Sequence, residues 1–250
     1  MMIAVSQSAP AVYSAAHAEI YDFIHAARGR DWAAEADEYA KLIRARNPEA
    51  DSLLDVACGT GEHLVRFGAE FGRTEGLELS AAMREIARRK LPDVPLHTAD
   101  MRDFDLRTGF DAVVCLCFSL AYVRTVAELC GTVASMARHL APGGVLVVEP
   151  WWFPERFVEG FVSAALAQED GRAVSRLSHT VRDGRLSRMT VRYTVAEPTG
   201  IREFTEYETL ALFEEREYAA AFTDAGCAVE YLPGGPNGRG LFIGVREGGR

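Results

Sequence analysis

Residues 53–61 read Leu-Leu-Asp-Val-Ala-Cys-Gly-Thr-Gly, and this stretch decides the fold. Its apolar beginning is typical of a buried strand, and Gly59 and Gly61 let the backbone bend sharply and a flat ligand lie against it. A dinucleotide fingerprint would place its third glycine where Leu64 stands, and no Gly-Lys-Ser/Thr follows for a nucleoside triphosphate. The stretch therefore favours a ligand that carries a nucleoside but no phosphate.

Short apolar runs recur along the first 150 residues, and segments with helical periodicity separate them. The expected strands are Leu53–Ala57, Thr74–Leu79, Val94–Ala99, Phe110–Cys117 and Val145–Glu149, and the expected helices are 16–27, 32–43, 62–71, 81–90 and 125–140. Strands that alternate with helices form right-handed crossovers and a mostly parallel sheet. We therefore predict an α/β, doubly wound, Rossmann-like domain.

The pattern changes after Trp151-Trp152, where polar and apolar residues begin to alternate. Asp183-Gly184 and Pro198-Thr199-Gly200 interrupt the alternation as turns do, which is typical of an antiparallel β meander. The expected strands are 172–182, 185–196 and 201–213, followed by a helix over 214–225 and strands over 228–232 and 241–246. We expect three parts: N-terminal helices and ligand-binding core over 1–150, a β insertion over 151–212, and a C-terminal helix with the last two core strands over 213–250.

Two acidic residues follow strands of the predicted sheet. Glu78 comes 17 residues after Gly61, where a carboxylate can accept both hydroxyl hydrogens of a ribose, and hydrogen bonds to charged groups contribute about 1.5–3 kcal/mol each. Asp100 ends the third strand, where an adenine amino group could donate to it. A lone carboxylate at a strand end is often a helix cap. Because ligands of open α/β sheets bind at the carboxyl ends of the strands, the shared location favours a nucleoside site.

These motifs together resemble those of class I S-adenosylmethionine (SAM)-dependent methyltransferases. The resemblance rests on Asp55-x-Ala57-Cys58-Gly59-Thr60-Gly61, Glu78, Asp100-Met101 and Phe110-Asp111-Ala112-Val113. It implies that the cofactor is SAM and that the cofactor contacts Tyr21, Asp55, Ala57, Gly59, Gly61, Glu78, Leu79, Asp100, Met101 and Cys115. It does not identify the methyl acceptor.

Segments outside these motifs resemble a narrower family, the N,N-dimethyltransferases of amino sugars linked to deoxythymidine diphosphate (dTDP), which make dimethylamino sugars of macrolide and related antibiotics. The segments are 13–22, Glu149–Pro154, Arg176–His179 and 233–242. The resemblance implies a seven-stranded methyltransferase sheet with an added antiparallel β layer, and a dTDP-amino sugar as substrate. It assigns the reaction centre to Tyr122 and Tyr13, and substrate binding to Tyr13, Arg28, Trp152, Ser178, His179 and Arg239. Members of the family carry His or Tyr at the position of Tyr122, so no catalytic imidazole is carried over to this chain.

A diphosphate in an acidic protein requires a local group of cations. Arg28 and Arg30 lie in the turn between the first two expected helices, and Arg239 lies between two glycines that let the backbone close on a ligand. Guanidinium groups bind phosphate bidentately, so we expect these arginines at the diphosphate. Side chains alternate along an extended segment, so one of Trp151 and Trp152 should face the same pocket.

Methyl transfer to an amine depends mainly on geometry. Holding two bound reactants in line contributes about 7–11 kcal/mol, whereas a general base contributes about 10²- to 10⁴-fold in rate. We therefore expect direct in-line transfer governed by positioning, with Tyr13 and Tyr21 forming a wall around the sulfonium through cation–π contacts. Dimethylation requires two turnovers.

Composition excludes several classes of function. The chain has 250 residues and a formal net charge of −9, which argues against binding nucleic acid or an anionic membrane surface. Its five cysteines form no C-x-x-C pair, its six histidines lack metal-ligand spacing, and its N-terminal apolar run lacks the basic start of a signal peptide. We expect no metal and no membrane span, a cytoplasmic location and a small-molecule substrate, and a homodimer is the assembly to test.

Three other functions are alternatives to methylation of a dTDP-amino sugar. A methyltransferase that acts on a hydroxyl or a free amine of another small molecule would not need the arginines. A protein that binds SAM without catalysis would not need the reaction centre. A nicotinamide oxidoreductase is disfavoured because the third glycine is absent.

Overall fold

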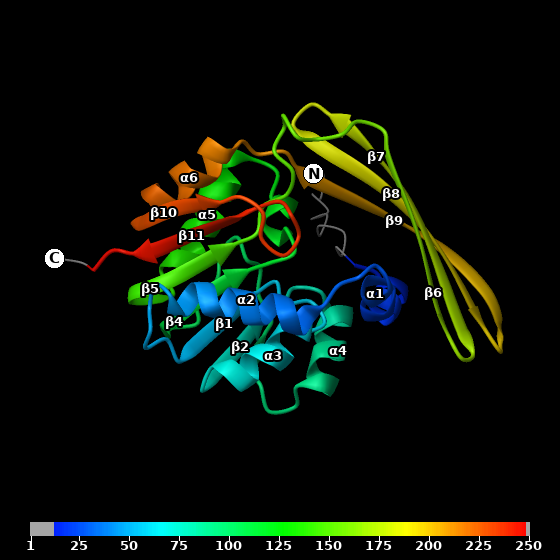
Figure 1. The fold of residues 1–250 in the computed structure, drawn as a ribbon, viewed down its shortest axis with the longest axis horizontal. Helices are drawn as coiled ribbons and strands as arrows, with labels where there is room; N and C mark the ends of the chain where they lie inside the picture. The colour runs from blue at the N-terminus through cyan, green and yellow to red at the C-terminus, as the bar shows by residue number, and fades with distance from the viewer. Residues whose placement is uncertain (1–12, 249–250) are drawn as a thin grey trace, which may run out of the picture.

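The computed structural model describes residues 13–248, which form two β-sheets with a helix between them (Figure 1). The larger sheet has seven strands in the order β10-β11-β5-β4-β1-β2-β3, and the smaller sheet has four strands in the order β6-β7-β8-β9. The predicted α/β, doubly wound class with an added antiparallel layer is confirmed.

The seven-stranded sheet is parallel except at β11, which runs antiparallel to β5 and to β10. Its strands are β1 (Ser52–Val56), β2 (Arg73–Leu77), β3 (Leu96–His97), β4 (Phe110–Cys115), β5 (Leu140–Val148), β10 (Cys227–Leu232) and β11 (Leu241–Arg246). The strand expected over 94–99 is reduced to the two residues of β3, at the edge of the sheet. The carboxyl ends of the parallel strands meet at one edge, which is the edge where α/β sheets bind ligands.

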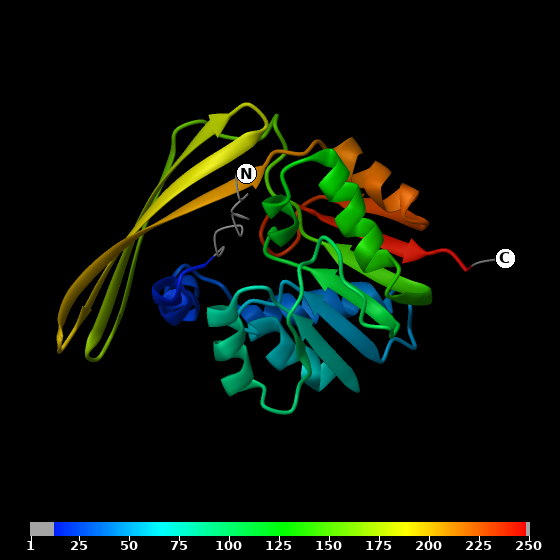
Figure 2. The ribbon, with the colours of Figure 1, turned by 180° about the vertical axis from the view of Figure 1, so that it is seen from behind.

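Helices cover both faces of this sheet because each carries an apolar stripe. The helices are α1 (Ala15–Ala27), α2 (Trp32–Arg44), α3 (Glu62–Glu70), α4 (Ala81–Lys90), the short 3₁₀ helix η1 (Ser119–Tyr122), α5 (Val126–Ala137) and α6 (Glu215–Asp224). Tyr39 of α2 and Phe67 of α3 pack on one face of the sheet, and Leu129 of α5 and Phe222 of α6 pack on the other. Figure 2 shows the α5–α6 face from the front.

The four-stranded sheet follows β5 and precedes α6 in the chain, as an insertion does. Its strands are β6 (Phe161–Glu169), β7 (Arg172–Asp183), β8 (Leu186–Glu197) and β9 (Gly200–Ala211), joined in antiparallel register. The sequence predicts the last three and misses β6. This edge strand has mostly exposed residues, including Phe161 and Leu166, so it lacks the clean alternation of a strand buried on one face.

Helix α1 joins the two sheets (Figure 1). Ile20 and Ile24 pack against Tyr193 and its apolar neighbours on the four-stranded sheet. On its other side, Asp22 accepts hydrogen bonds from Thr60 Oγ1 in the glycine loop after β1 (2.5 Å) and from Lys90 Nζ in α4 (2.5 Å). The loop of one sheet is thus tied to the face of the other. No helix in the described part of the chain is long and apolar enough to cross a membrane.

Candidate active site

The loop after β1 has an unusual backbone. Ala57, Gly59 and Gly61 all lie in the left-handed region, with φ of +60°, +58° and +81°. A Cβ on Gly61 would lie 2.9 Å from Leu91 Cδ1, so Gly61 allows the loop to pack closely against α4 and the residues after it. A Cβ on Gly59 would meet nothing within 4 Å. Gly59 is therefore the glycine that leaves open space for a ligand, whereas Gly61 serves packing.

This difference predicts that alanine at Gly61 chiefly lowers stability, whereas alanine at Gly59 chiefly weakens binding. Gly61→Ala should lower the free energy of unfolding by about 2–4 kcal/mol, because left-handed strain adds to overpacking. Gly59→Ala should cost only about 1–2 kcal/mol from strain but should weaken SAM binding, since its Cβ enters the open space. Urea unfolding and titration calorimetry with SAM measure both effects. Equal losses of stability with equal SAM affinity would contradict the division of roles.

Glu78 directly follows β2 and is fixed toward the glycine loop. Its Oε2 accepts a hydrogen bond from the Gly59 amide (2.9 Å), and its Oε1 accepts one from the Ser80 amide (2.6 Å). Burial raises the pKa of Glu78, and these backbone donors partly oppose the shift. A carboxylate has about four lone-pair positions, so two remain for the hydroxyls of a ribose.

The residues around Glu78 fit an adenosyl group. Gly59 leaves open space, Leu79 exposes 51% of its surface as an apolar platform, and Glu78 supplies acceptors for vicinal hydroxyls. Asp55 is buried behind them, where burial and the charge of Glu78 raise its pKa. The loop has no phosphate-binding lysine, which agrees with a nucleoside that carries a sulfonium in place of phosphates.

Three further residues predicted to contact the cofactor differ in their placement. Asp100 is held by Arg102, whose Nη2 lies 2.6 Å from Oδ2, and this hydrogen bond lowers the pKa of Asp100. Met101 is partly buried against the core. Cys115 is fully buried inside the core at the end of β4, and its contact with the cofactor stays a prediction. The apolar pattern that made β4 recognisable is also what encloses Cys115.

Tyr13 and Tyr122 are brought into direct contact although 109 residues separate them. Their hydroxyl oxygens lie 2.8 Å apart, with Tyr13 two residues before α1 and Tyr122 at the end of η1. Tyr21 follows about two helical turns later, on α1. The centroid of its ring lies 5.8 Å from the ring centroid of Tyr13. Tyr13 and Tyr21 therefore lie side by side, as the predicted aromatic wall requires, and their contact with the sulfonium stays a prediction.

The inner face of the four-stranded sheet carries polar side chains toward these tyrosines. Arg176 and Ser178 of β7 are buried on this face, and Arg176 Nη1 donates to Ser178 Oγ (3.0 Å). His179 is exposed on the outer face, because successive strand side chains point to opposite faces. Its contact with substrate stays a prediction.

Glu208 is a site residue that the sequence analysis missed. It lies on β9, is 9% exposed, and its Oε2 accepts a hydrogen bond from the Tyr122 hydroxyl (3.4 Å). The available signal was the alternation in β9, where Glu206 and Glu208 share one face and Tyr207, 77% exposed, points to the other. Acidic residues at every second position usually mark the solvent face of a strand, but Glu206 and Glu208 lie on the inner face.

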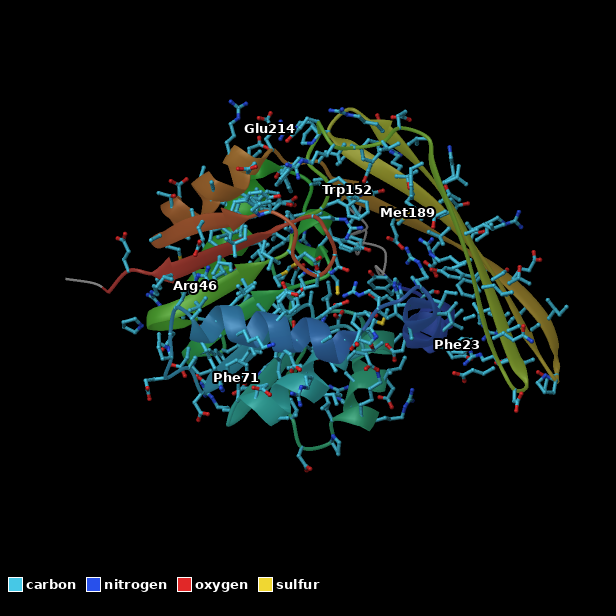
Figure 3. All side chains as sticks on the ribbon, in the orientation of Figure 1. Phe23, Arg46, Phe71, Trp152, Met189 and Glu214 are labelled. Carbon is cyan, nitrogen blue, oxygen red and sulfur yellow. The ribbon has the colours of Figure 1, made fainter. Side chains whose placement is uncertain are left out.

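Arg239 lies in an aromatic cage. Its guanidinium carbon is 4.6, 4.7 and 4.9 Å from the ring centroids of Phe118, Trp151 and Trp152. Trp151 is buried, with its Nε1 donating to Ser187 Oγ (3.0 Å), whereas Trp152 is half-buried. Figure 3 shows Trp152 beside the seven-stranded part of the molecule and Met189 on the four-stranded sheet. One tryptophan of the pair is thus left free to face a ligand.

Burial lowers the pKa of Arg239, and the positive charges of Arg30 and Arg28 add to this shift. Arg30 is paired with Glu35 and donates to Cys117 Sγ (3.3 Å), and Arg28 is exposed just after α1. Glu149, a second missed residue, is buried and accepts from the Cys117 amide (2.7 Å). Burial raises the pKa of Glu149, and the charges of Arg239 and Arg30 oppose that shift. The region combines cations with aromatic surface, as a nucleotide-binding site requires.

Comparison with known proteins assigns the class. The family described as methyltransferase domain matches residues 53–144, which include the glycine loop, Glu78 and Asp100. The solved structure of SAM-bound CalS10, an amino pentose methyltransferase from Micromonospora echinaspora involved in calicheamicin biosynthesis, is 50% identical and has a TM-score of 0.85, covering 91% of this chain and 96% of that chain. The fold and the cofactor are those of a SAM-dependent methyltransferase.

Relatives that match nearly the whole chain define the family. The dTDP-4-amino-2,3,4,6-tetradeoxy-D-glucose N,N-dimethyltransferase of Saccharopolyspora spinosa is 65% identical over 236 residues, which cover 94% of this chain and 95% of the relative. The crystal structure of Streptomyces venezuelae DesVI is 56% identical with a TM-score of 0.91, covering 94% of this chain and 100% of that chain. The chain belongs to the family of dTDP-amino-sugar N,N-dimethyltransferases. The predicted resemblance, the SAM cofactor and the N-methyltransferase activity are confirmed.

Proposed function

We propose that this protein transfers two methyl groups from SAM, one per turnover, to the amine of a dTDP-linked aminodeoxysugar. The observation that carries the proposal is the contact between the Tyr13 and Tyr122 hydroxyls. The Glu78 carboxylate held at Gly59 and the arginine and aromatic region around Arg239 support it. The 65% identical relative is named for a 4-amino sugar, so a dTDP-4-amino sugar is the first substrate to test.

In this proposal the chain acts by holding and orienting. Glu78 and Gly59 hold the adenosine portion of SAM, which supplies an activated methyl group when bound. Arg239 and Arg28 bind the diphosphate, Trp152 and Ser178 contact the rest of the nucleotide sugar, and Tyr13 and Tyr122 place the amine. Positioning supplies the larger share of the rate, because aligned reactants gain about 7–11 kcal/mol.

The decisive assay incubates the protein with SAM and either dTDP-4-amino or dTDP-3-amino sugars, and follows the substrate mass. A gain of two methyl groups on one of them supports the proposal. Methylation of the free amino sugar at the same efficiency as its dTDP form would instead favour a methyltransferase of another small molecule. SAM binding without transfer to any amine would favour a non-catalytic protein.

We also propose a homodimer that forms through the outer face of the four-stranded sheet. Five large apolar residues on this face are 57–77% exposed: Val162, Leu166, Leu177, Ile201 and Tyr207. Such a patch is rare on the free surface of a monomer. Leu177→Lys should convert the dimer to a monomer in light scattering after size exclusion, whereas Arg156→Ala, at an exposed residue outside this sheet, should leave the dimer intact. A wild-type protein that is monomeric at high concentration would refute this assembly.

Two expectations remain proposals about the whole chain. We propose the division into 1–150, 151–212 and 213–250, which places the four-stranded sheet in the middle part. We also propose a cytoplasmic location, supported by the five cysteines, which are all free thiols as a reducing compartment would keep them. The small-molecule substrate remains the expected partner, in place of nucleic acid or membrane.

A further inference from the structure

Glu208 is a buried carboxylate that forms no direct ion pair among the described residues. Among residues 13–248, no Lys, Arg or His forms an ion pair with it, and its side-chain hydrogen bond is to the Tyr122 hydroxyl, 3.4 Å away. A buried carboxylate without a direct ion pair is costly, and the nearby positive charge of Arg176 offsets that cost only in part. Its placement on β9, facing η1 across the junction of the two sheets, points to a role in the reaction.

The proposed reaction requires that the sugar nitrogen lose a proton. Each methyl transfer leaves the sugar nitrogen as an ammonium ion, which has no lone pair for a second transfer. The ammonium must lose a proton before the second turnover, and an amine that arrives protonated must lose one before the first. A proton acceptor near the amine therefore raises the rate of both turnovers.

We propose that Glu208 accepts the proton of the sugar ammonium through the hydroxyl of Tyr122. This inference rests on the proposed function. The N–H of the ammonium donates to the Tyr122 oxygen while the Tyr122 O–H proton moves to Glu208 Oε2. The nitrogen keeps the electron pair of the broken N–H bond, Tyr122 is neutral before and after, and Glu208 becomes a carboxylic acid that releases its proton to solvent between turnovers.

The surroundings of both residues suit this transfer. Burial raises the pKa of Glu208, and the positive charge of Arg176 opposes the shift. Burial also raises the pKa of Tyr122 well above its usual value, so the hydroxyl passes a proton on but does not ionise. The titratable and charged groups that face Glu208 are Tyr13, Tyr21 and Arg28 from the α1 segment, Tyr122 from η1, Arg176 from β7, Tyr193 from β8 and Glu206 from β9.

The test compares Glu208→Gln with Glu203→Gln, an exposed carboxylate on the same strand. We expect Glu208→Gln to lower kcat for dimethylation by about 10²-fold near neutral pH, with a deficit that shrinks as the pH rises and solvent supplies more free amine. KM for the sugar nucleotide and Kd for SAM should stay within about twofold. With excess SAM, the monomethyl product should accumulate. Glu203→Gln should match the wild type in rate, pH profile and product ratio.

Tyr122→Phe gives an independent measurement that does not alter the carboxylate. It should slow turnover without abolishing it and show the same pH-dependent deficit. The double variant should be no slower than the slower single variant, because the two residues act in series. Glu208→Asp should recover part of the rate, and SAM binding by calorimetry reports whether each variant is folded.

The outcomes separate the two proposals. A wild-type protein that methylates no dTDP-amino sugar would refute the proposed function. An active wild type whose Glu208→Gln and Tyr122→Phe variants keep its pH profile and product ratio would refute the proton transfer alone. If Glu208→Gln does not fold, the pH profile of Tyr122→Phe decides between these results.

Discussion

Replacing Glu78 with alanine is expected to raise the Kd for SAM by about 10²- to 10⁴-fold. The substitution removes two hydrogen bonds from a charged acceptor to the ribose, each contributing about 1.5–3 kcal/mol, and every 1.4 kcal/mol is tenfold in affinity. The carboxylate is already oriented by the amides of Gly59 and Ser80, so little ordering of this side chain opposes binding. Titration calorimetry with SAM measures the change directly.

Glu75→Gln is the matched control for Glu78→Ala. Glu75 is an equally buried carboxylate on β2, but it pairs with His97, away from the glycine loop. The Glu75→Gln variant should bind SAM with the same affinity as the wild type. Because Glu78→Ala also frees the amides of Gly59 and Ser80, urea unfolding should accompany the binding measurement. An unchanged Kd in a folded Glu78→Ala variant would remove the basis for placing the ribose here.

Replacing Arg239 with alanine is expected to raise KM for the sugar nucleotide by about 10²-fold or more. A guanidinium binds phosphate through two parallel charged hydrogen bonds, which together contribute about 3 kcal/mol or more. The cage of Phe118, Trp151 and Trp152 holds Arg239 in one orientation, so the fork is preorganised for the ligand. Calorimetry with dTDP alone tests the contact without turnover.

Two variants show whether the effect comes from the phosphate contact. Arg239→Lys keeps the charge and loses the fork, so it should recover only part of the affinity. Arg156→Ala removes an exposed arginine that also lies over an aromatic ring, Phe153, and should bind dTDP as the wild type does. SAM affinity should be unchanged in all three. Equal dTDP affinity in Arg239→Ala and wild type would place the diphosphate elsewhere.

The core sheet was predictable because its signal is local. The stretch through Asp55 and Gly59 combines a buried strand with a tight turn, and the same strand type recurs at regular spacing. Glu78 could be found for the same reason, since its position relative to a strand end is a property of the sequence. β6 escaped because an exposed edge strand has no consistent buried face.

The candidate site was predictable only in part because it is assembled from two sheets. Successive residues of a strand face opposite sides, so Ser178 faces inward and His179 does not. A prediction that is wrong by one residue therefore selects the wrong face. Glu208 on β9 and Glu149 directly after β5 were missed because a carboxylate in or beside a strand has the same appearance in the sequence whether it faces solvent or a buried site.

The sequence by itself determined the fold class, the cofactor and the family, since these depend on spacing within short segments and on motifs that do not change with context. Only the tertiary structure decided which side chains meet. The contacts of Tyr13 with Tyr122, and of Tyr122 with Glu208, join residues 109 and 86 positions apart through the docking of α1 and β9 on the core. Contacts of that kind depend on which face each element buries against its neighbour, and no local pattern records that choice.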